Sequence, residues 1–434
     1  MLLKLKNNVG FDAELIEQKR DKGIILKIGI IDADLLNGGT RHPNLALLKM
    51  SGFCKGCNHE VTLIKKYEEL GIASTLWLDE FIKYSPYDVL ILSQVFKFTV
   101  VPDYITALIE RGYIYYGGTG FFEINGPNLP ARVEHHMPDY SLYLDYIEEE
   151  TGGDPKKKKR DWDDYLSYSI GFTTRGCIRH CGFCVNRLSN GVVPWSPVSE
   201  FYDETRPRIY LWDDNILAAS PVVVKKVFDD LNSTGKPFQF RQGMDIRLIT
   251  PKKAMVLSSS HYYGDFIFAF DHYRMDDEKE KREVEHTLKG LEIWRKYTDK
   301  QTKLYVIVAY DGQDAEDIRG TFWRIKKLMD YGCLPYIMRY EKYNDSRYKS
   351  MYIQLARWCN QPNMFKKMTF REFCIRNEEY HQKTAKNPQN HCSCYQTMLD
   401  FERENPDIAK EYFDLRYDTE RRKAFLLPEE ERKA

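Results

Sequence analysis

The chain has 434 residues, which is more than one ordinary domain needs and suits two. Hydrophobic residues make up 43% of it, enough for real cores, and 64 basic residues balance 64 acidic ones. Net charge therefore gives no support to a nucleic-acid or membrane partner, and no stretch approaches the roughly 20 apolar residues of a membrane span. The first residues form too short an apolar run for a signal peptide. We expect a cytoplasmic protein whose ten cysteines are thiols or metal ligands rather than disulfides.

Short apolar runs alternate with helical patterns over the first 150 residues. Four candidate strands lie at 27–32, 60–64, 87–96 and 113–118, with helical stretches such as 42–53 and 102–112 between them. This alternation indicates an open, mostly parallel α/β sheet, which we assign to a first domain at 1–150. The segment GGDPKKKKR (152–160) then combines breaking residues with a charge run, which is typical of a solvated linker.

Beyond this segment the alternation of strands and helices resumes, with longer intervals between the candidate strands. Six candidate strands lie at 168–174, 208–214, 238–246, 265–271, 303–311 and 335–340, and helical patterns separate most of them. Six βα units in series predict a partial (β/α)6 barrel over 161–345, whose working residues lie at the carboxyl ends of the strands. Residues 346–434 are expected to form a helical C-terminal extension.

A cysteine-rich loop, TTRGCIRHCGFCVN, follows the first of these six strands. Cys177, Cys181 and Cys184 have the spacing C-x3-C-x2-C. Three thiolates on one short loop can hold three irons of a cubane and leave the fourth iron open to a chelating amine and carboxylate. The alternative is a Cys3His zinc site completed by His180. His180 directly precedes Cys181, however, and a zinc knuckle would not need the βα array that follows.

This loop resembles that of the radical S-adenosylmethionine (SAM) superfamily, which has the same spacing, an aromatic residue before the last cysteine, and the same place after strand one of a (β/α)6 barrel. The resemblance covers roughly 165–345. It implies a [4Fe–4S] cluster on the three cysteines with SAM on the open iron. Electron transfer to the sulfonium would then give a 5′-deoxyadenosyl radical that abstracts hydrogen from a substrate.

The same resemblance implies an electron donor such as flavodoxin or ferredoxin. It leaves the substrate open, because a small molecule, a peptide or a nucleotide fits the neutral, aromatic-rich composition about equally. It also implies that Gly182 and Phe183 shape the adenine side of the site through backbone contacts. A GGE sequence, which often contacts the SAM amine in this superfamily, is not found in the chain.

Polar residues end the second and third strands of the predicted barrel. Asp213 and Asp214 in LWDDN, and Gln242 and Arg247 in FRQGMDIR, are expected to contact SAM or the substrate. The alternative for the acids, and for Asn215 beside them, is a strand-end turn with helix capping. For Arg247 it is an internal ion pair, since Asp245 is two residues away.

The later strands end in Asp271 and His272, in Asp311 and in Arg339. By the barrel rule these side chains are candidates for the acid, base or anchor that acts on the substrate. The sequence does not choose among them.

Residues 27–125 resemble the cobalamin-binding-type α/β domain that precedes the barrel in one large radical SAM subclass. The turn Gly118–Phe121 is placed where that domain often has a glycine-rich turn. The usual lower-ligand pattern there is D-x-H-x-x-G, but this chain has Asp34, Leu36 and Gly39, so a lower axial histidine is not expected. Cobalamin is therefore a doubtful cofactor, and we favour a scaffold or a substrate lid.

Three alternative functions stay open beside a radical SAM enzyme that works without cobalamin. The first is a cobalamin-dependent radical SAM methyltransferase, which would use the N-terminal domain. The second is a zinc-stabilised binding protein without catalysis. The third is a protein that keeps the cluster for sensing or scaffolding.

The remaining cysteines fall into smaller groups. Cys54 and Cys57, followed by His59, form a C-x2-C pair, which alone is a weak metal signal.

Three cysteines of the C-terminal extension form another group. Cys374, Cys392 and Cys394 are the best candidates for an auxiliary metal site. Cys333 and Cys359 are expected to be buried thiols, because cysteine is among the residue types most often buried.

Overall fold

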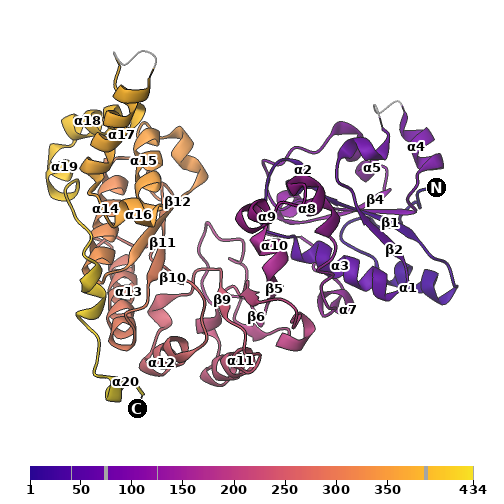
Figure 1. The fold of residues 1–434 in the computed structure, drawn as a ribbon, viewed down its shortest axis with the longest axis horizontal. Coiled ribbons are helices and arrows are strands. Elements are labelled where there is room, and N and C mark those ends of the chain that lie inside the picture. Colours follow the sequence, from indigo (N-terminus) through magenta and orange to yellow (C-terminus); the bar gives the residue numbers. More distant parts are fainter. Residues whose placement is uncertain (41, 73–76, 125, 386–389, 434) are drawn as a thin grey trace. The chain divides into compact units, whose positions relative to one another are not determined.

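The computed structural model describes residues 1–40, 42–72, 77–124, 126–385 and 390–433 (Figure 1). The chain divides into two compact units. Unit 1 consists of Met1–Thr173, Val185–Leu188 and Trp195–Tyr210, and unit 2 of Thr174–Cys184, Ser189–Pro194 and Leu211–Ala434. Across the described residues, no helix combines the length and the apolar character that crossing a membrane requires.

Unit 1 is built on a four-stranded sheet of order β2-β1-β3-β4, in which every pairing is parallel. Its strands are β1 (Lys27–Asp32), β2 (Glu60–Leu63), β3 (Val89–Ser93) and β4 (Ile114–Gly117). The two central strands, KIGIID and VLILS, are apolar almost throughout, because helices cover both faces of the sheet. The parallel α/β fold expected for this half is therefore confirmed.

Ten helices accompany these strands in the described part of unit 1. They are α1 (Ala13–Asp21), α2 (Ala33–Leu36), α3 (Leu45–Gly56), α4 (Leu78–Tyr84), α5 (Asp103–Glu110), α6 (Thr119–Phe122), α7 (Ala131–Glu134), α8 (Leu144–Thr151), α9 (Pro155–Asp161) and α10 (Asp163–Ser167). Successive strand residues point to opposite faces, so Ile30 joins the core that contains Phe53 of α3. Its neighbour Ile31 joins the core that contains Ile105 of α5.

The segment that the sequence marks as a linker is helical instead. Gly152 ends α8 with a φ of 58°, and α9 starts directly afterwards at Pro155. The Asp154 side chain accepts a hydrogen bond from Lys156 N at 2.8 Å, so the Asp-Pro pair supplies a helix cap and a first helical residue. The lysines that follow lie on this short helix, mostly exposed to solvent.

The last strands of unit 1 are β5 (Tyr168–Gly171) and most of β8 (Arg208–Leu211), which are neighbours in one sheet. The buried guanidinium of Arg206 donates to the backbone oxygens of Tyr165, Tyr168 and Tyr140. These bonds tie both strands to the preceding helices of unit 1. Unit 1 therefore extends along the chain to Tyr210, well beyond the change of sequence pattern at 150–160. The domain limits 1–150, 161–345 and 346–434 stay a prediction.

Unit 2 continues the series of parallel strands. They are β9 (Phe238–Phe240), β10 (Phe266–Ala269), β11 (Thr302–Val308) and β12 (Leu334–Arg339), and β10-β11-β12 form one sheet. Arg241 N, just after β9, donates to the oxygen of Leu211, the last residue of β8. Parallel bridges then join Phe238 to Tyr262 and Met244 to Phe268. The strands of this unit therefore follow one another in space in chain order, as a βα series predicts.

The helices between these strands are α11 (Pro221–Ser233), α12 (Pro251–Ser259), α13 (Glu278–Tyr297) and α14 (Ala315–Asp330). The C-terminal helices are α15 (Lys349–Cys359), α16 (Pro362–Phe365), α17 (Phe370–Thr384), α18 (Ser393–Glu404), α19 (Pro406–Tyr412) and α20 (Glu429–Lys433). The C-terminal extension is thus helical, as expected (Figure 1). The strand predicted over 238–246 ends earlier, at Phe240, because Asp245 caps the short 3-10 helix Ile246–Leu248.

Candidate metal and cofactor site

The cysteine loop of unit 2 is closed at its base by a short antiparallel ribbon. Strands β6 (Thr174–Arg175) and β7 (Val193–Pro194) pair with Arg175 opposite Val193. Gly176, the first residue after β6, has a φ of 94°, and a Cβ there would overlap the carbonyl oxygen of Gly191. Only glycine fits this position, where the chain turns away from the ribbon towards the cysteines.

Two carboxylates at the end of β8 anchor the start of this loop. Thr174 donates to Asp213 Oδ1 from its backbone N at 2.6 Å and from its hydroxyl at 2.7 Å. The backbone N of Gly176 donates to Asp214 Oδ2 at 2.6 Å. Asp213 is almost fully buried, so its charge is held by these bonds rather than by water. Both acids position the loop, while their contact with SAM stays a prediction.

The sulfur of Cys177 receives two N–H donors. The backbone N of Arg179 lies 3.3 Å from Sγ, and Asn215 Nδ2 lies 3.4 Å from it. Asn215 is buried at the end of β8, and its Oδ1 accepts from Asp245 N at 3.4 Å. Hydrogen bonds to sulfur stabilise a thiolate ligand and tune the potential of a metal bound to it.

A charged network lies beside the loop. Asp245 accepts from Arg179 Nε at 2.8 Å and from Arg247 Nε at 2.6 Å, and Arg247 also pairs with Glu283 at 2.6 Å. Burial acts to raise the pKa of Asp245, but the ion pairs with Arg247 and Arg179 outweigh it and hold that pKa below its usual range. Arg247 therefore has the internal carboxylate partner that the sequence offered as an alternative, and its contact with SAM stays a prediction.

An aromatic cluster lies beside the second and third cysteines. The Phe183 and Tyr310 rings pack edge-on with their centres 5.2 Å apart, and the centres of the Tyr310 and Tyr340 rings lie 4.9 Å apart. A Cβ at Gly182 would overlap the Tyr310 hydroxyl, so glycine is needed for this close approach. The expected contact of Gly182 and Phe183 with adenine remains a prediction, but their place beside a ring cluster suits a flat ligand.

The other strand ends are engaged in different ways. Gln242 is exposed after β9. Asp271 accepts from Ile307 N at 3.2 Å, and His272 Nδ1 lies 3.0 Å from Glu280. Asp311 pairs with Arg274 at 3.2 Å on the surface, and the Arg339 guanidinium lies over the Tyr343 ring at 4.6 Å.

The three loop cysteines are half-buried free thiols. Burial, helped by the Asp271 carboxylate, raises the pKa of Cys181 to about 11, although the Arg247 charge acts in the opposite direction. Within the described part of the chain, no three or more His, Cys, Asp or Glu side chains are grouped tightly enough to hold a metal ion. The thiolates of a cubane bind separate irons, so they need not converge on one point. The closed loop, its spacing and the N–H donors to Cys177 fit three ligands of such a cluster.

At the carboxyl ends of the unit 1 strands, the acidic side chains are bound by other residues of unit 1. Asp32, at the end of β1, is fully buried and accepts from the Tyr143 hydroxyl at 2.7 Å. Asp34 accepts from Val95 N at 2.6 Å and from the Thr99 hydroxyl at 2.5 Å. Asp34, which stands where the D-x-H-x-x-G pattern of that family would begin, thus holds the loop after β3.

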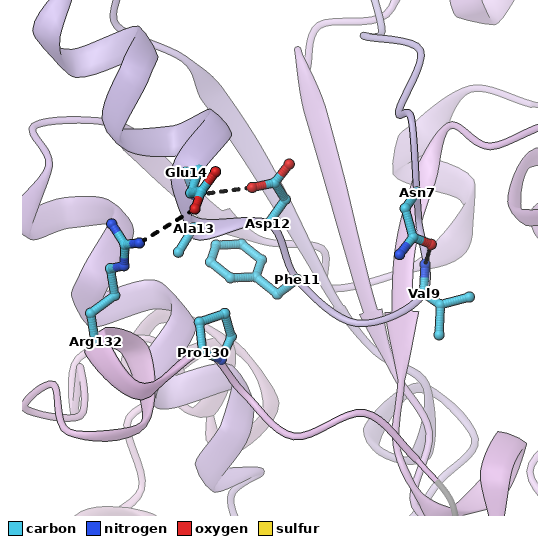
Figure 2. Close-up of a pocket in the computed structure, with 8 residues that line it drawn as sticks. All are labelled: Asn7, Val9, Phe11, Asp12, Ala13, Glu14, Pro130 and Arg132. Carbon is cyan, nitrogen blue, oxygen red and sulfur yellow. Dashed lines mark hydrogen bonds and ion pairs between the residues drawn. The ribbon is translucent and has the colours of Figure 1, made fainter.

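A separate pocket of about 280 Å³ opens on unit 1. Figure 2 shows Glu14 between Asp12 and Arg132 at its rim. The Arg132 guanidinium lies 3.8 Å from the Glu14 carboxylate, and Glu14 N donates to Asp12 at 3.0 Å. The lining thus carries two acids and one base beside apolar residues, and the base is shared with Glu17, so nothing in the pocket identifies a ligand.

Cys54 and Cys57 lie in a hydrophobic core of unit 1. The ring of His59 is used on both sides, because Nδ1 accepts from Leu26 N at 3.2 Å and Nε2 donates to Ile16 O at 3.0 Å. This trio is therefore part of the packing. Cys333 and Cys359 are buried thiols as expected.

Three residues of the site were missed by the sequence analysis: Arg179, Glu283 and Tyr310. Arg179 lies within the cysteine loop and Tyr310 lies two residues after the end of β11, so both positions carried a signal. Glu283 lies within the long helix α13, which contains several other acidic residues, so its position carried no signal in the sequence.

No family model matches the chain, and no curated protein does. Among solved structures, the radical S-adenosylmethionine methyltransferase TsrM from Kitasatospora setae, with cobalamin and a [4Fe–4S] cluster bound, is 12% identical with a TM-score of 0.44. That match covers 73% of this chain and 75% of the other. The same enzyme with tryptophan substrate and the SAM analogue aza-SAM is 12% identical, with a TM-score of 0.43 and 72% of each chain covered. The likeness is remote.

Proposed function

We propose that the protein is a radical SAM enzyme whose [4Fe–4S] cluster is held by Cys177, Cys181 and Cys184. One observation carries the proposal. A three-cysteine loop of the required spacing is closed by its own ribbon and anchored to Asp213 and Asp214, which follow the carboxyl end of β8.

When bound, the cluster and SAM would supply one-electron chemistry and a radical able to abstract hydrogen. The chain contributes the surroundings. Asn215 and the backbone of Arg179 donate to the Cys177 sulfur, and Arg247 places positive charge near Cys181. Phe183 and Tyr310 form an aromatic wall beside the loop. The substrate stays unassigned.

The test uses full-length protein purified and reconstituted without oxygen. We expect about four irons and four sulfides per chain, as one cubane requires, and 5′-deoxyadenosine formed from SAM with a strong reductant. The variant Cys177→Ala/Cys181→Ala/Cys184→Ala should lose both, while Cys54→Ala, a buried cysteine of unit 1, should keep both.

Other outcomes point elsewhere. Zinc in place of iron that is lost in the Cys177→Ala/Cys181→Ala/Cys184→Ala variant, together with no SAM cleavage, would overturn the proposal in favour of a zinc-stabilised binding protein. A cluster that forms no 5′-deoxyadenosine with any candidate substrate would indicate a sensing or scaffolding role. Added cobalamin that raises turnover would assign the methyltransferase alternative.

A further inference from the structure

A second group of thiols lies in the C-terminal helices, outside the site described above. Cys374 of α17 and Cys394 of α18 are twenty residues apart in the chain, yet their sulfurs lie 3.6 Å apart and both side chains are buried. Cys392, the residue that caps α18, is half-buried and close enough to interact electrostatically with both. Two buried sulfurs from two helices are thus in contact, and a third thiol lies at the start of α18.

The spacing of the two buried sulfurs suits a shared metal ion. A tetrahedral zinc ion with bonds of about 2.3 Å to sulfur holds two thiolates about 3.8 Å apart. Sulfurs joined in a disulfide lie only about 2.05 Å apart.

A histidine and a carboxylate complete the surroundings. His391 Nδ1 lies 2.9 Å from Glu378 Oε1, and Cys392 N donates to Glu378 Oε2 at 2.8 Å. One carboxylate therefore holds both His391 and Cys392 at the hairpin. With Nδ1 bound to Glu378, the Nε2 atom of His391 is the nitrogen left for a metal, an arrangement common in histidine–zinc sites.

We propose that Cys374, Cys392, Cys394 and His391 bind one zinc ion, with Glu378 orienting the histidine. Only the two buried sulfurs are in place beforehand, since the described side chains include no tight group of three ligands. Cys392 and His391 complete the site by turning inward. A surface pocket of about 450 Å³ is lined in part by Glu378, His391 and Tyr395, so an ion from solvent can reach His391.

Such an ion would staple α17 to α18, which pack together with buried apolar residues on each side. The C-terminal extension would then depend on zinc for part of its stability. The inference is independent of the proposed radical SAM activity, because none of its ligands belongs to the cysteine loop.

The test measures zinc in the full-length chain, on wild type and matched variants. We expect one zinc per chain in wild type, none in Cys374→Ser/Cys392→Ser/Cys394→Ser, and one in Cys177→Ser/Cys181→Ser/Cys184→Ser. Cys359→Ala, a buried thiol of α15 in the same extension, should keep the zinc. Replacing zinc by Co²⁺ should give the visible absorption of a tetrahedral thiolate site.

Milder variants guard against loss of folding. Cys392→Ala removes a half-exposed side chain, so the helices should form while zinc binds at least tenfold more weakly. Glu378→Gln should weaken zinc binding about 10- to 100-fold through the histidine. A wild-type chain without zinc, zinc retained in the Cys374/Cys392/Cys394 variant, or a Cys374–Cys394 disulfide trapped in freshly isolated protein would each overturn the proposal.

Discussion

Acidic residues follow strands in two of the described sheets, and these acids bind different partners. At the edge of the unit 1 sheet, Asp32 and Asp34 hold Tyr143 and the loop after β3, so the edge is closed by the chain itself. At the end of β8, Asp213 and Asp214 hold the start of a loop that carries three half-buried thiols. Strand-end carboxylates alone therefore do not mark a reactive site. The two strand ends differ in the segment that the carboxylates position, which is an ordinary loop in unit 1 and the cysteine loop after β8.

The largest effect is expected where the loop leaves its ribbon. Gly176→Ala adds a Cβ that overlaps Gly191 O at a left-handed backbone position, which by itself costs an alanine about 1 kcal/mol. We expect the iron content after reconstitution to fall to that of the triple cysteine variant. Gly235→Ala is the control, because Gly235 has a φ of 68° but nothing near its Cβ position. Full iron content in Gly176→Ala would contradict the closed loop.

The anchoring carboxylate comes next. Asp213→Asn replaces a charged acceptor of two hydrogen bonds by an amide, and hydrogen bonds to charged groups contribute about 1.5–3 kcal/mol each. The cluster should then be lost to an iron chelator at least tenfold faster than from wild type. Asp229→Asn, an exposed pair with Lys225 on α11, should lose iron at the wild-type rate. Equal rates for the two variants would remove Asp213 from the account.

A smaller effect is expected at the aromatic cluster. Gly182→Ala should displace Tyr310 and slow SAM cleavage by about tenfold, with iron content unchanged. The added Cβ would overlap the Tyr310 hydroxyl but lie 3.4 Å from the ring carbon that bears it, which is an ordinary contact. Gly182→Ala/Tyr310→Phe should therefore recover most of the rate. A double variant as slow as Gly182→Ala would show that Tyr310 is not what the alanine displaces.

The sequence predicts the secondary-structure elements of this protein better than it predicts the contacts within the site. Strand β1 matches its predicted range because KIGIID is a continuous apolar run, and β9 is shorter than predicted because Asp245 caps a turn. The lysine segment was assigned as a linker, although its Asp-Pro pair starts a helix. Neighbouring residues are enough to predict the limits of these elements when helix-capping residues such as Asp154 and Asp245 are taken into account.

The site depends on long-range partners, which one sequence does not reveal. The sequence analysis names Asp213 and Asp214 as SAM or substrate contacts, and nothing in LWDDN shows that they bind the backbone of Thr174 and Gly176. In the same way, the partner of Arg247 in α13 lies 36 residues away. The cysteine spacing was readable because its three members lie on one short loop.

The smallest effect concerns the closed edge of unit 1. Burial raises the pKa of Asp32 to about 6, above that of an unfolded chain, so its contribution to stability is present at low pH and is lost as the pH rises through about 6. Between pH 5 and pH 7 the free energy of opening unit 1 should fall by about 1 kcal/mol from this group. Hydrogen exchange of the β1 and β3 amides, corrected for intrinsic rates, measures this. In Asp32→Asn that part of the pH dependence should vanish, and an unchanged slope would contradict the assignment.

The most direct test of the central claim is the EPR spectrum of the dithionite-reduced, reconstituted chain with and without SAM. A [4Fe–4S]⁺ signal that changes on adding SAM, is absent in Cys181→Ala and is unchanged in Cys54→Ala is the predicted result. It would place SAM on the open iron of a cluster held by the loop. A signal that persists in Cys181→Ala, or one that SAM leaves unaltered, would contradict the claim.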